Sequence, residues 1–360
     1  MNMRNGFSAK RVGTKGDFSM NFAMWNKALK VIPQVSREEW NHLDFVSKWL
    51  ISTRAAVLVM TLISAMLAGL FAIRDNLFQP LPWLALAFGL IMAHASNNLF
   101  NDYTDYVRGV DQKNYYRAMY GPQPLVDGLM TRRQNLTYFV ITVSLALASG
   151  LYLAWYNSFD TLIWTLVGLG AFFLLFYTWP LKHMALGEVA VVIVWGPLMI
   201  GGGYYVLTHN WNWNVVWATL PYALGVTTVI FGKHIDKIEA DQEKNIHTLP
   251  VLMGEKAARQ MVLGMMVLPY FLLVYLVATK YFTPLILIVL LSIPRLRQVL
   301  PAFLNPKPAT RPQNFPEGQG GWPLYFAPLA FGYNRSFGTL FVLGLIADVH
   351  IRLLLPTFWR

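Results

Sequence analysis

The chain has no cysteine, which excludes disulfide bonds and thiol chemistry. It also has few charged residues, 13% of the total, whereas 55% of its 360 residues are hydrophobic and 15% are aromatic. Mean hydropathy is +0.41. Because ordinary soluble domains carry charge on about a quarter of their residues, this composition excludes that class and predicts a polytopic membrane protein.

Acidic residues are particularly scarce: there are 18, against 29 Lys and Arg, and the formal net charge is +11. A basic excess indicates nucleic-acid binding when it lies within one soluble domain. Here the basic residues border apolar segments instead, which is how membrane proteins mark their cytoplasmic side. We therefore expect a lipid bilayer as partner and no nucleic acid.

Apolar segments of about twenty residues, the length that crosses a bilayer as a helix, recur along the chain. We expect nine, near residues 55–73, 82–101, 136–155, 160–179, 187–207, 215–233, 258–278, 281–300 and 336–355. The predicted fold class is all-α, a bundle of about nine transmembrane helices. Residues 51–360 form the transmembrane domain. Residues 1–50 form a polar cytoplasmic tail and one interfacial helix, which begins at a Ser36–Glu39 capping box.

The basic residues predict which ends of these spans are cytoplasmic. All but four Lys and Arg residues lie in the N-terminal tail or follow spans two, four, six and eight; the exceptions are Arg74, Lys280, Arg352 and Arg360. The positive-inside rule then places the tail and those four connections in the cytoplasm. We expect a multi-pass protein of the inner cell membrane, with its N-terminus in the cytoplasm and its C-terminus outside.

A cluster of polar residues ends the second span. Asn98, Asp102 and Asp105 are spaced i, i+4 and i+7, so a helix aligns them on one face. Gly109 then allows a turn, which could bring Asp111 back toward the same point. Carboxylates are costly at membrane depth, so such a cluster indicates function.

A second acidic cluster, containing Asp236, Glu239 and Asp241, follows the sixth span and therefore emerges on the same side. Two groups of carboxylates at the inner ends of two spans could face each other across the bundle. Oxygen ligands of this kind suit Mg²⁺. The alternative is that both clusters are solvated, charged loop ends.

One family of membrane enzymes has an aspartate motif similar to the run Asn101-Asp102-Tyr103-Thr104-Asp105, continued to Asp111: the UbiA-type intramembrane prenyltransferases. The branch that prenylates 1,4-dihydroxy-2-naphthoate (the MenA-like branch) is the most similar. Further similarities to it lie at residues 121–134, 177–182, 186–188, 195–197, 203–205 and 248–251. The resemblance covers about residues 50 to 300.

The resemblance implies an enzyme that uses Mg²⁺ to transfer a polyprenyl group from an isoprenyl diphosphate to a small aromatic acceptor. The acceptor it implies is 1,4-dihydroxy-2-naphthoate, a step of menaquinone biosynthesis. Catalysis is then expected from carboxylates of both clusters: Asp102, Asp105, Asp236 and Asp241. The metal ligands are expected among Asp102, Asp105, Asp111, Asp236, Glu239 and Asp241.

The second cluster departs from the family pattern at one position. The family usually has an aspartate four residues before the last aspartate, and here Lys237 stands there, with Asp236 one place earlier. Asp236 and Asp241 lie about 140° apart on a regular helix. Either the end of span six is distorted, or Glu239 supplies the ligand.

The remaining site residues follow from the chemistry of the expected substrates. We expect the diphosphate beside Asn98, Asn101 and four cations at the inner ends of spans: Arg54, Arg108, Lys182 and Lys233. An allyl cation is stabilised by aromatic faces, and the candidates to line its site are Tyr177, Tyr204 and Tyr205. Glu188 is a candidate for contacting the acceptor; the alternative is a paired structural carboxylate.

Two other functions remain open on the sequence alone. An intramembrane terpene cyclase of the same family would share the metal site but use no aromatic acceptor. A cation transporter would also place acids in a membrane, but transporter sites usually lie near the midplane, whereas these acids gather at one face.

Overall fold

The computed structural model describes residues 20–110, 121–313, 315, 322–355 and 359. Regular structure in these residues is helical, apart from an isolated bridge between Met184 and His247. The all-α prediction is confirmed.

Eight helices of the described chain are long and apolar enough to cross a membrane. They are α4 (Ala55–Arg74), α5 (Pro80–Val107), α7 (Arg132–Tyr156), the joined α9, η2 and α10 (Gly187–Ile193, Val194–Gly201, Gly202–Thr208), α11 (Trp213–Ile235), α13 (Leu249–Ala278), the joined η3 and α14 (Pro284–Ser292, Ile293–Leu304) and α15 (Phe326–Leu354). The expected fourth span is α8 (Thr161–Phe176), whose 16 residues reach about 24 Å at the helical rise. It is shorter than a bilayer core of roughly 30 Å.

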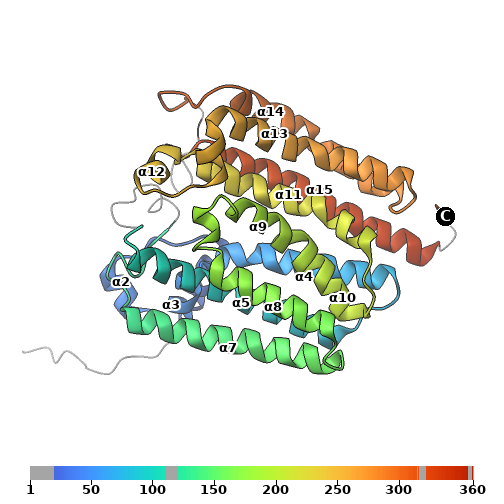
Figure 1. Ribbon diagram of the computed structural model, residues 1–360, viewed down its shortest axis with the longest axis horizontal. Coiled ribbons are helices and arrows are strands. Elements are labelled where there is room, and N and C mark those ends of the chain that lie inside the picture. The colour runs from blue at the N-terminus through green and yellow to red at the C-terminus, as the bar shows by residue number, and fades with distance from the viewer. Residues whose placement is uncertain (1–19, 111–120, 314, 316–321, 356–358, 360) are drawn as a thin grey trace, which may run out of the picture.

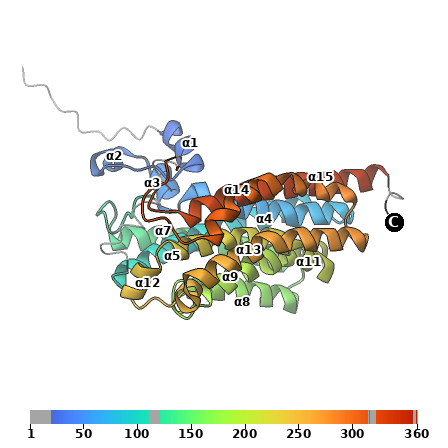
Figure 2. The same ribbon diagram turned by 90° about the horizontal axis from the view of Figure 1, so that it is seen from above.

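Successive helices of the bundle, the shorter α8 included, run in opposite directions, so the connections gather at two ends of the bundle (Figure 1). One end carries Arg54, Arg108 and Asp236, and we call it the motif end. Helix α15 finishes at the opposite end in both views (Figures 1 and 2). Both acidic clusters therefore lie at one end of the molecule, as their position after even-numbered spans predicts.

The bundle is held by close packing between helices. Within it α5 packs along α7, and α11 packs along both α13 and α15. Gly203 on α10 is one close approach: a Cβ there would come within 3.1 Å of both Ala68 on α4 and Leu86 on α5. Small residues at such positions allow membrane helices to associate by van der Waals contact.

The N-terminal region differs from the expected tail and single helix. Residues 22–30 form a helix, α1 (Phe22–Lys30), and two further helices follow, α2 (Arg37–His42) and α3 (Phe45–Ser52). The Ser36–Glu39 capping box is present at the start of α2. The chain breaks after α2 because Asp44 caps α3, accepting the N–H of Ser47 at 3.0 Å. All three helices lie at the motif end (Figure 2).

Candidate active site

The first cluster lies on the last turns of α5, and its polar face is turned inward. Asn98, Asp102 and Asp105 are all buried, as their helical spacing predicts. Asn98 donates from Nδ2 to the carbonyl of Thr53 at 2.8 Å. The guanidinium of Arg54 forms an ion pair with Asp102. These two contacts join α5 to the break between α3 and α4.

Helix α5 ends in the turn that Gly109 was expected to allow. Gly109 has φ +71°, and the N–H of Val110 returns to the carbonyl of Asp105 at 2.9 Å, a Schellman arrangement. Arg108 is exposed and stacks over the ring of Trp179 at 4.2 Å. Asn101 is half-buried. Asp111 lies outside the described residues.

The second cluster is divided between two helices. Helix α11 ends at Ile235, and the short α12 (Ile238–Glu243) begins after Lys237. The ammonium of Lys237 lies 2.9 Å from Oδ1 of Asp241, and both side chains are buried. The end of span six is therefore distorted, one of the two possibilities that the sequence left open.

Three contacts bring the two clusters together. Lys182, in the short helix η1 (Leu181–His183), lies 3.4 Å from Oδ2 of Asp105. The Lys244 ammonium donates to the carbonyl of Val110, just beyond the first cluster. The bridge between Met184 and His247 joins the two loops that carry these lysines.

The pKa of Lys237 is influenced by charged residues of both clusters. Its pKa lies below the ordinary value, first because the ammonium is buried and also because Lys182 is near; the charges of Asp241 and Asp105 act in the opposite direction. Lys237 is thus close enough to carboxylates of both clusters to be affected by each. Two lysines and two aspartates form one buried group, which we call the Lys–Asp cluster: Lys182, Asp105, Lys237 and Asp241.

The position of Asp236 does not match the expectation that it holds a metal. Its carboxylate accepts the backbone N–H groups of Tyr325 and Phe326 at Oδ1, at 2.9 and 3.0 Å, and that of Ala327 at Oδ2, at 2.9 Å. Burial raises the pKa of Asp236 to about 6, although these three N–H groups act in the opposite direction. Asp236 caps the first turn of α15, whose N–H groups have no partner within their own helix.

Glu239 is not placed to replace Asp236 as a metal ligand. It lies on the exposed side of α12, whereas Asp241 on the same helix is buried. Of the three acidic candidates in the second cluster, Asp241 is the one whose carboxylate pairs with a lysine, Lys237.

Glu188 is buried at the start of α9 and is paired, which was the alternative that the sequence left open; its partner was not predicted. Its Oε1 lies 2.6 Å from Nδ1 of His234 on α11, and His234 is also buried. The two residues are 46 positions apart, so no local spacing could indicate the contact. Lys233 is half-buried on the last turn of α11, and Tyr177 is half-buried at the end of α8.

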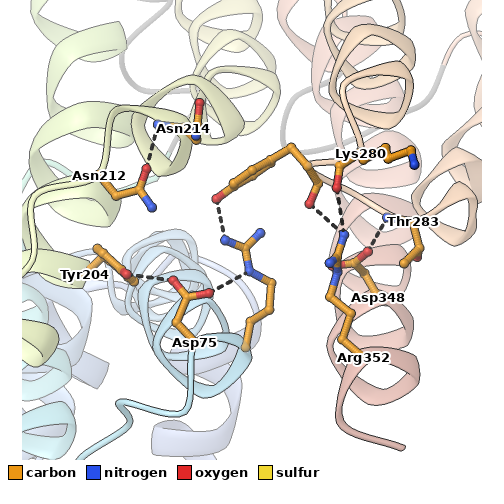
Figure 3. A network of polar contacts seen from close by, with 10 residues as sticks. Asp75, Tyr204, Asn212, Asn214, Lys280, Thr283, Asp348 and Arg352 are labelled. Carbon is orange, nitrogen blue, oxygen red and sulfur yellow. Dashed lines mark hydrogen bonds and ion pairs between the residues drawn. The ribbon is translucent and has the colours of Figure 1, made fainter. Parts of the chain in front are cut away.

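The expectation that Tyr204 and Tyr205 line the cation site is wrong, because both lie at the opposite end. The Tyr204 hydroxyl donates to Oδ2 of Asp75 at 2.7 Å, just beyond the last residue of α4. Figure 3 shows this bond within a polar network that also includes Lys280, Thr283, Asp348 and Arg352. The Tyr205 hydroxyl bonds to Asp160. Helix α4 alone, with 20 residues, separates Asp75 from Arg54 by about 30 Å.

The donor atoms at the motif end fit a hard cation that is shared with a phosphate ligand. Asp105 Oδ1 and Asp241 Oδ2 are buried oxygens without a hydrogen-bond partner. No group of three or more His, Cys, Asp or Glu side chains within the described ranges is placed to hold a metal by itself. Mg²⁺ commonly binds proteins through one or two carboxylates and takes its other ligands from water and substrate phosphates. The residues present fit that mode.

The known proteins that this chain is similar to are prenyltransferases. The model for the UbiA prenyltransferase family matches residues 61–313. The chain is 26% identical over 256 residues to a 1,4-dihydroxy-2-naphthoate octaprenyltransferase from Bacillus subtilis, covering 70% of this chain and 81% of the relative. A protein of the same name from Escherichia coli is 27% identical over 219 residues, covering 59% of this chain and 70% of the relative.

A solved structure shows the same fold. A UbiA homologue from Archaeoglobus fulgidus bound to GPP and Mg²⁺ superposes with a TM-score of 0.54 at 16% identity, covering 84% of this chain and 99% of the homologue.

Proposed function

Because the chain belongs to the UbiA prenyltransferase family and is a multi-pass membrane prenyltransferase, we propose that it transfers a polyprenyl group from a prenyl diphosphate to a small aromatic acceptor, with Mg²⁺. The acceptor we propose is 1,4-dihydroxy-2-naphthoate, a step of menaquinone biosynthesis. The names of the Bacillus and Escherichia relatives support this choice. The observation that carries the proposal is the Lys–Asp cluster, in which one buried aspartate of each motif pairs with a lysine at the same end of an apolar bundle.

The Lys–Asp cluster and its neighbours at the motif end offer the groups that the head of a prenyl diphosphate requires. We propose Asp102, Asp105 and Asp241 as the carboxylates that would hold Mg²⁺, which, when bound, supplies positive charge to the diphosphate as the allylic carbon–oxygen bond breaks. Lys182, Lys233, Arg54 and Arg108 are proposed to bind the phosphate oxygens, together with the amides Asn98 and Asn101. Fixed donors of this kind stabilise a leaving group because they require no reorganisation during the reaction.

The substrate's apolar chain would lie among the helices, where water is excluded. Water exclusion protects a reactive allyl cation from hydrolysis, and Tyr177 is the aromatic residue that we propose to line its site. We propose that Glu188, oriented by His234 at 2.6 Å, contacts the acceptor. The positive-inside rule supports placing the motif end in the cytoplasm and the C-terminus outside, in the inner membrane.

The proposal is tested by incubating purified protein with a labelled prenyl diphosphate, with and without Mg²⁺, and a panel of aromatic acceptors that includes 1,4-dihydroxy-2-naphthoate. We expect a prenylated naphthoate that forms only with Mg²⁺. The Asp102→Ala variant should be inactive but folded, and Glu239→Gln, an exposed acid of the second motif, should keep its activity. A cyclised hydrocarbon formed without an acceptor would contradict the proposal and identify a terpene cyclase.

A further inference from the structure

We propose that Lys237 is a displaceable counterion of Asp241. Its ammonium pairs with the Asp241 carboxylate before substrate and metal bind, and it moves to the diphosphate when they bind. The inference rests on the proposed function, since it concerns the same site. It assigns to Lys237 a phosphate-binding role at a position where the family pattern has an aspartate.

The Lys–Asp cluster contains two similar lysine–aspartate ion pairs. Asp105 has one oxygen on Lys182, at 3.4 Å, and Asp241 has one oxygen on Lys237, at 2.9 Å. The second oxygen of each carboxylate is buried without a partner. Each aspartate is therefore half satisfied by a lysine and has an open oxygen that a further cation would satisfy.

The net charge of the Lys–Asp cluster also favours a movable lysine. Two lysines and two aspartates sum to zero, and a neutral group offers little attraction to a diphosphate anion. If the carboxylates turn to a divalent cation, the two ammonium groups become available to the phosphates. The same four side chains then contribute to binding both the metal and the anion, beside the other cations and the carboxylate proposed above.

The position of Lys237 in the chain also supports the proposal. Its backbone is fixed between α11 and α12, where its N–H donates to the carbonyl of His234 at 3.3 Å. Only the four-carbon side chain needs to rotate, and a lysine ammonium has three donors on a flexible stem. The bridge between Met184 and His247 keeps the segment that carries Lys182 beside the segment that follows α12, so we expect a phosphate bound by Lys182 to lie on the same side of the site as Lys237.

The experiment compares Lys237→Gln with the wild-type protein in lipid nanodiscs, with Lys256→Gln as the control because Lys256 is an exposed lysine on α13. Binding of Mn²⁺ alone is measured by electron paramagnetic resonance. Removing the counterion leaves Asp241 open to the metal, so Lys237→Gln should bind Mn²⁺ several-fold more tightly than either the wild type or Lys256→Gln.

Binding of a non-reacting geranyl thiodiphosphate with Mg²⁺ is measured on the same proteins. Lys237→Gln should bind it roughly 10- to 100-fold more weakly, the range for one lost charge-assisted hydrogen bond, and Lys237→Arg should stay within a few-fold of the wild type. Should Lys237→Gln not fold, Lys237→Met carries the same two expectations.

Opposite changes in metal and analogue affinity distinguish this role from a structural ion pair. Unchanged or weaker Mn²⁺ binding, or unchanged analogue binding, in a folded Lys237→Gln protein would overturn the inference while leaving the proposed function intact. A wild-type protein that does not bind the analogue at all would overturn the proposed function itself.

Discussion

Asp236 and Ala327 are 91 residues apart in the chain, and the carboxylate of the first accepts the N–H of the second at 2.9 Å. This bond joins the end of α11 to the first turn of α15. The backbones of the two helices also approach closely here. A Cβ at Gly232, one turn before Asp236, would come within 2.9 Å of the Ala327 nitrogen. An acid within the second motif therefore has a structural role.

Replacing Asp236 is expected to destabilise the protein without changing its metal site. Asp236→Ala leaves three N–H groups, two of them buried, without their acceptor, so the free energy of unfolding should fall by about 1–3 kcal/mol. Asp236→Asn keeps one acceptor oxygen and should lose less. Thermal unfolding and Mn²⁺ binding are measured on both variants. An Asp236→Ala protein with unchanged thermal stability and lost Mn²⁺ binding would make Asp236 a metal ligand after all.

Tyr204 provides the matching test at the opposite end of the bundle. Tyr204→Phe removes the hydroxyl that donates to Asp75, so we expect a loss of about 0.5–1.5 kcal/mol in stability and turnover close to that of the wild type. Chemical denaturation and the turnover assay provide the two readouts. A large fall in turnover with unchanged stability would mean that Tyr204 does contact the reacting groups.

The docking of α1 is expected to depend on pH through Asp44. Burial alone would raise the pKa of Asp44, but hydrogen bonds from Ser47, Asn21 and Trp25 outweigh it and hold this pKa at about 2. A carboxyl whose pKa is lower in the folded state stabilises that state above its unfolded pKa, here 3.8, and the contribution disappears as the pH falls toward 2.

Hydrogen exchange of the amides in residues 22–30 measures this effect. Corrected for intrinsic rates, their protection should be constant above about pH 4, the ordinary carboxyl range, and should decline below it. Asp44→Asn cannot ionise, so its protection should be lower at neutral pH and should not change over that interval. Equal protection of wild type and variant at pH 7 would contradict the role given to Asp44.

Much of the fold and part of the site followed from the sequence, because both depend on local periodicity. The spacing of Asn98, Asp102 and Asp105 predicted a buried face on one helix, and α5 has it. Apolar run length predicted the spans, and the distribution of Lys and Arg predicted which ends of the helices lie together. The i, i+4 spacing of Lys237 and Asp241 also indicates their ion pair. Comparison with the family pattern instead draws attention to Lys237 as the position where an aspartate ligand is missing.

Contacts between distant segments could not be predicted in this way. The sequence predicts Asp236 as a ligand, and nothing near it in the chain reveals its actual partners, the backbone N–H groups at the start of α15 about ninety residues later. The sequence predicts Tyr204 near the reaction as an aromatic residue that could stabilise an allyl cation, but the length of the helix from Gly187 to Thr208 places it at the other end of the bundle. The pair of Glu188 and His234 likewise depends on how α9 packs against α11.

If the two acidic motifs act on one site, the effects of changing Asp105 and Asp241 depend on each other, and a double-mutant cycle measures that dependence. Turnover is measured for Asp105→Asn, Asp241→Asn and the double variant, each shown to be folded by thermal unfolding. We predict that each single change lowers turnover by at least about 100-fold, as for loss of one group that stabilises transition-state charge. The double variant should be no more than a few-fold worse than the poorer single variant, because residues that act as a unit are not additive. Losses that multiply would contradict a shared site and mean that the two carboxylates act independently.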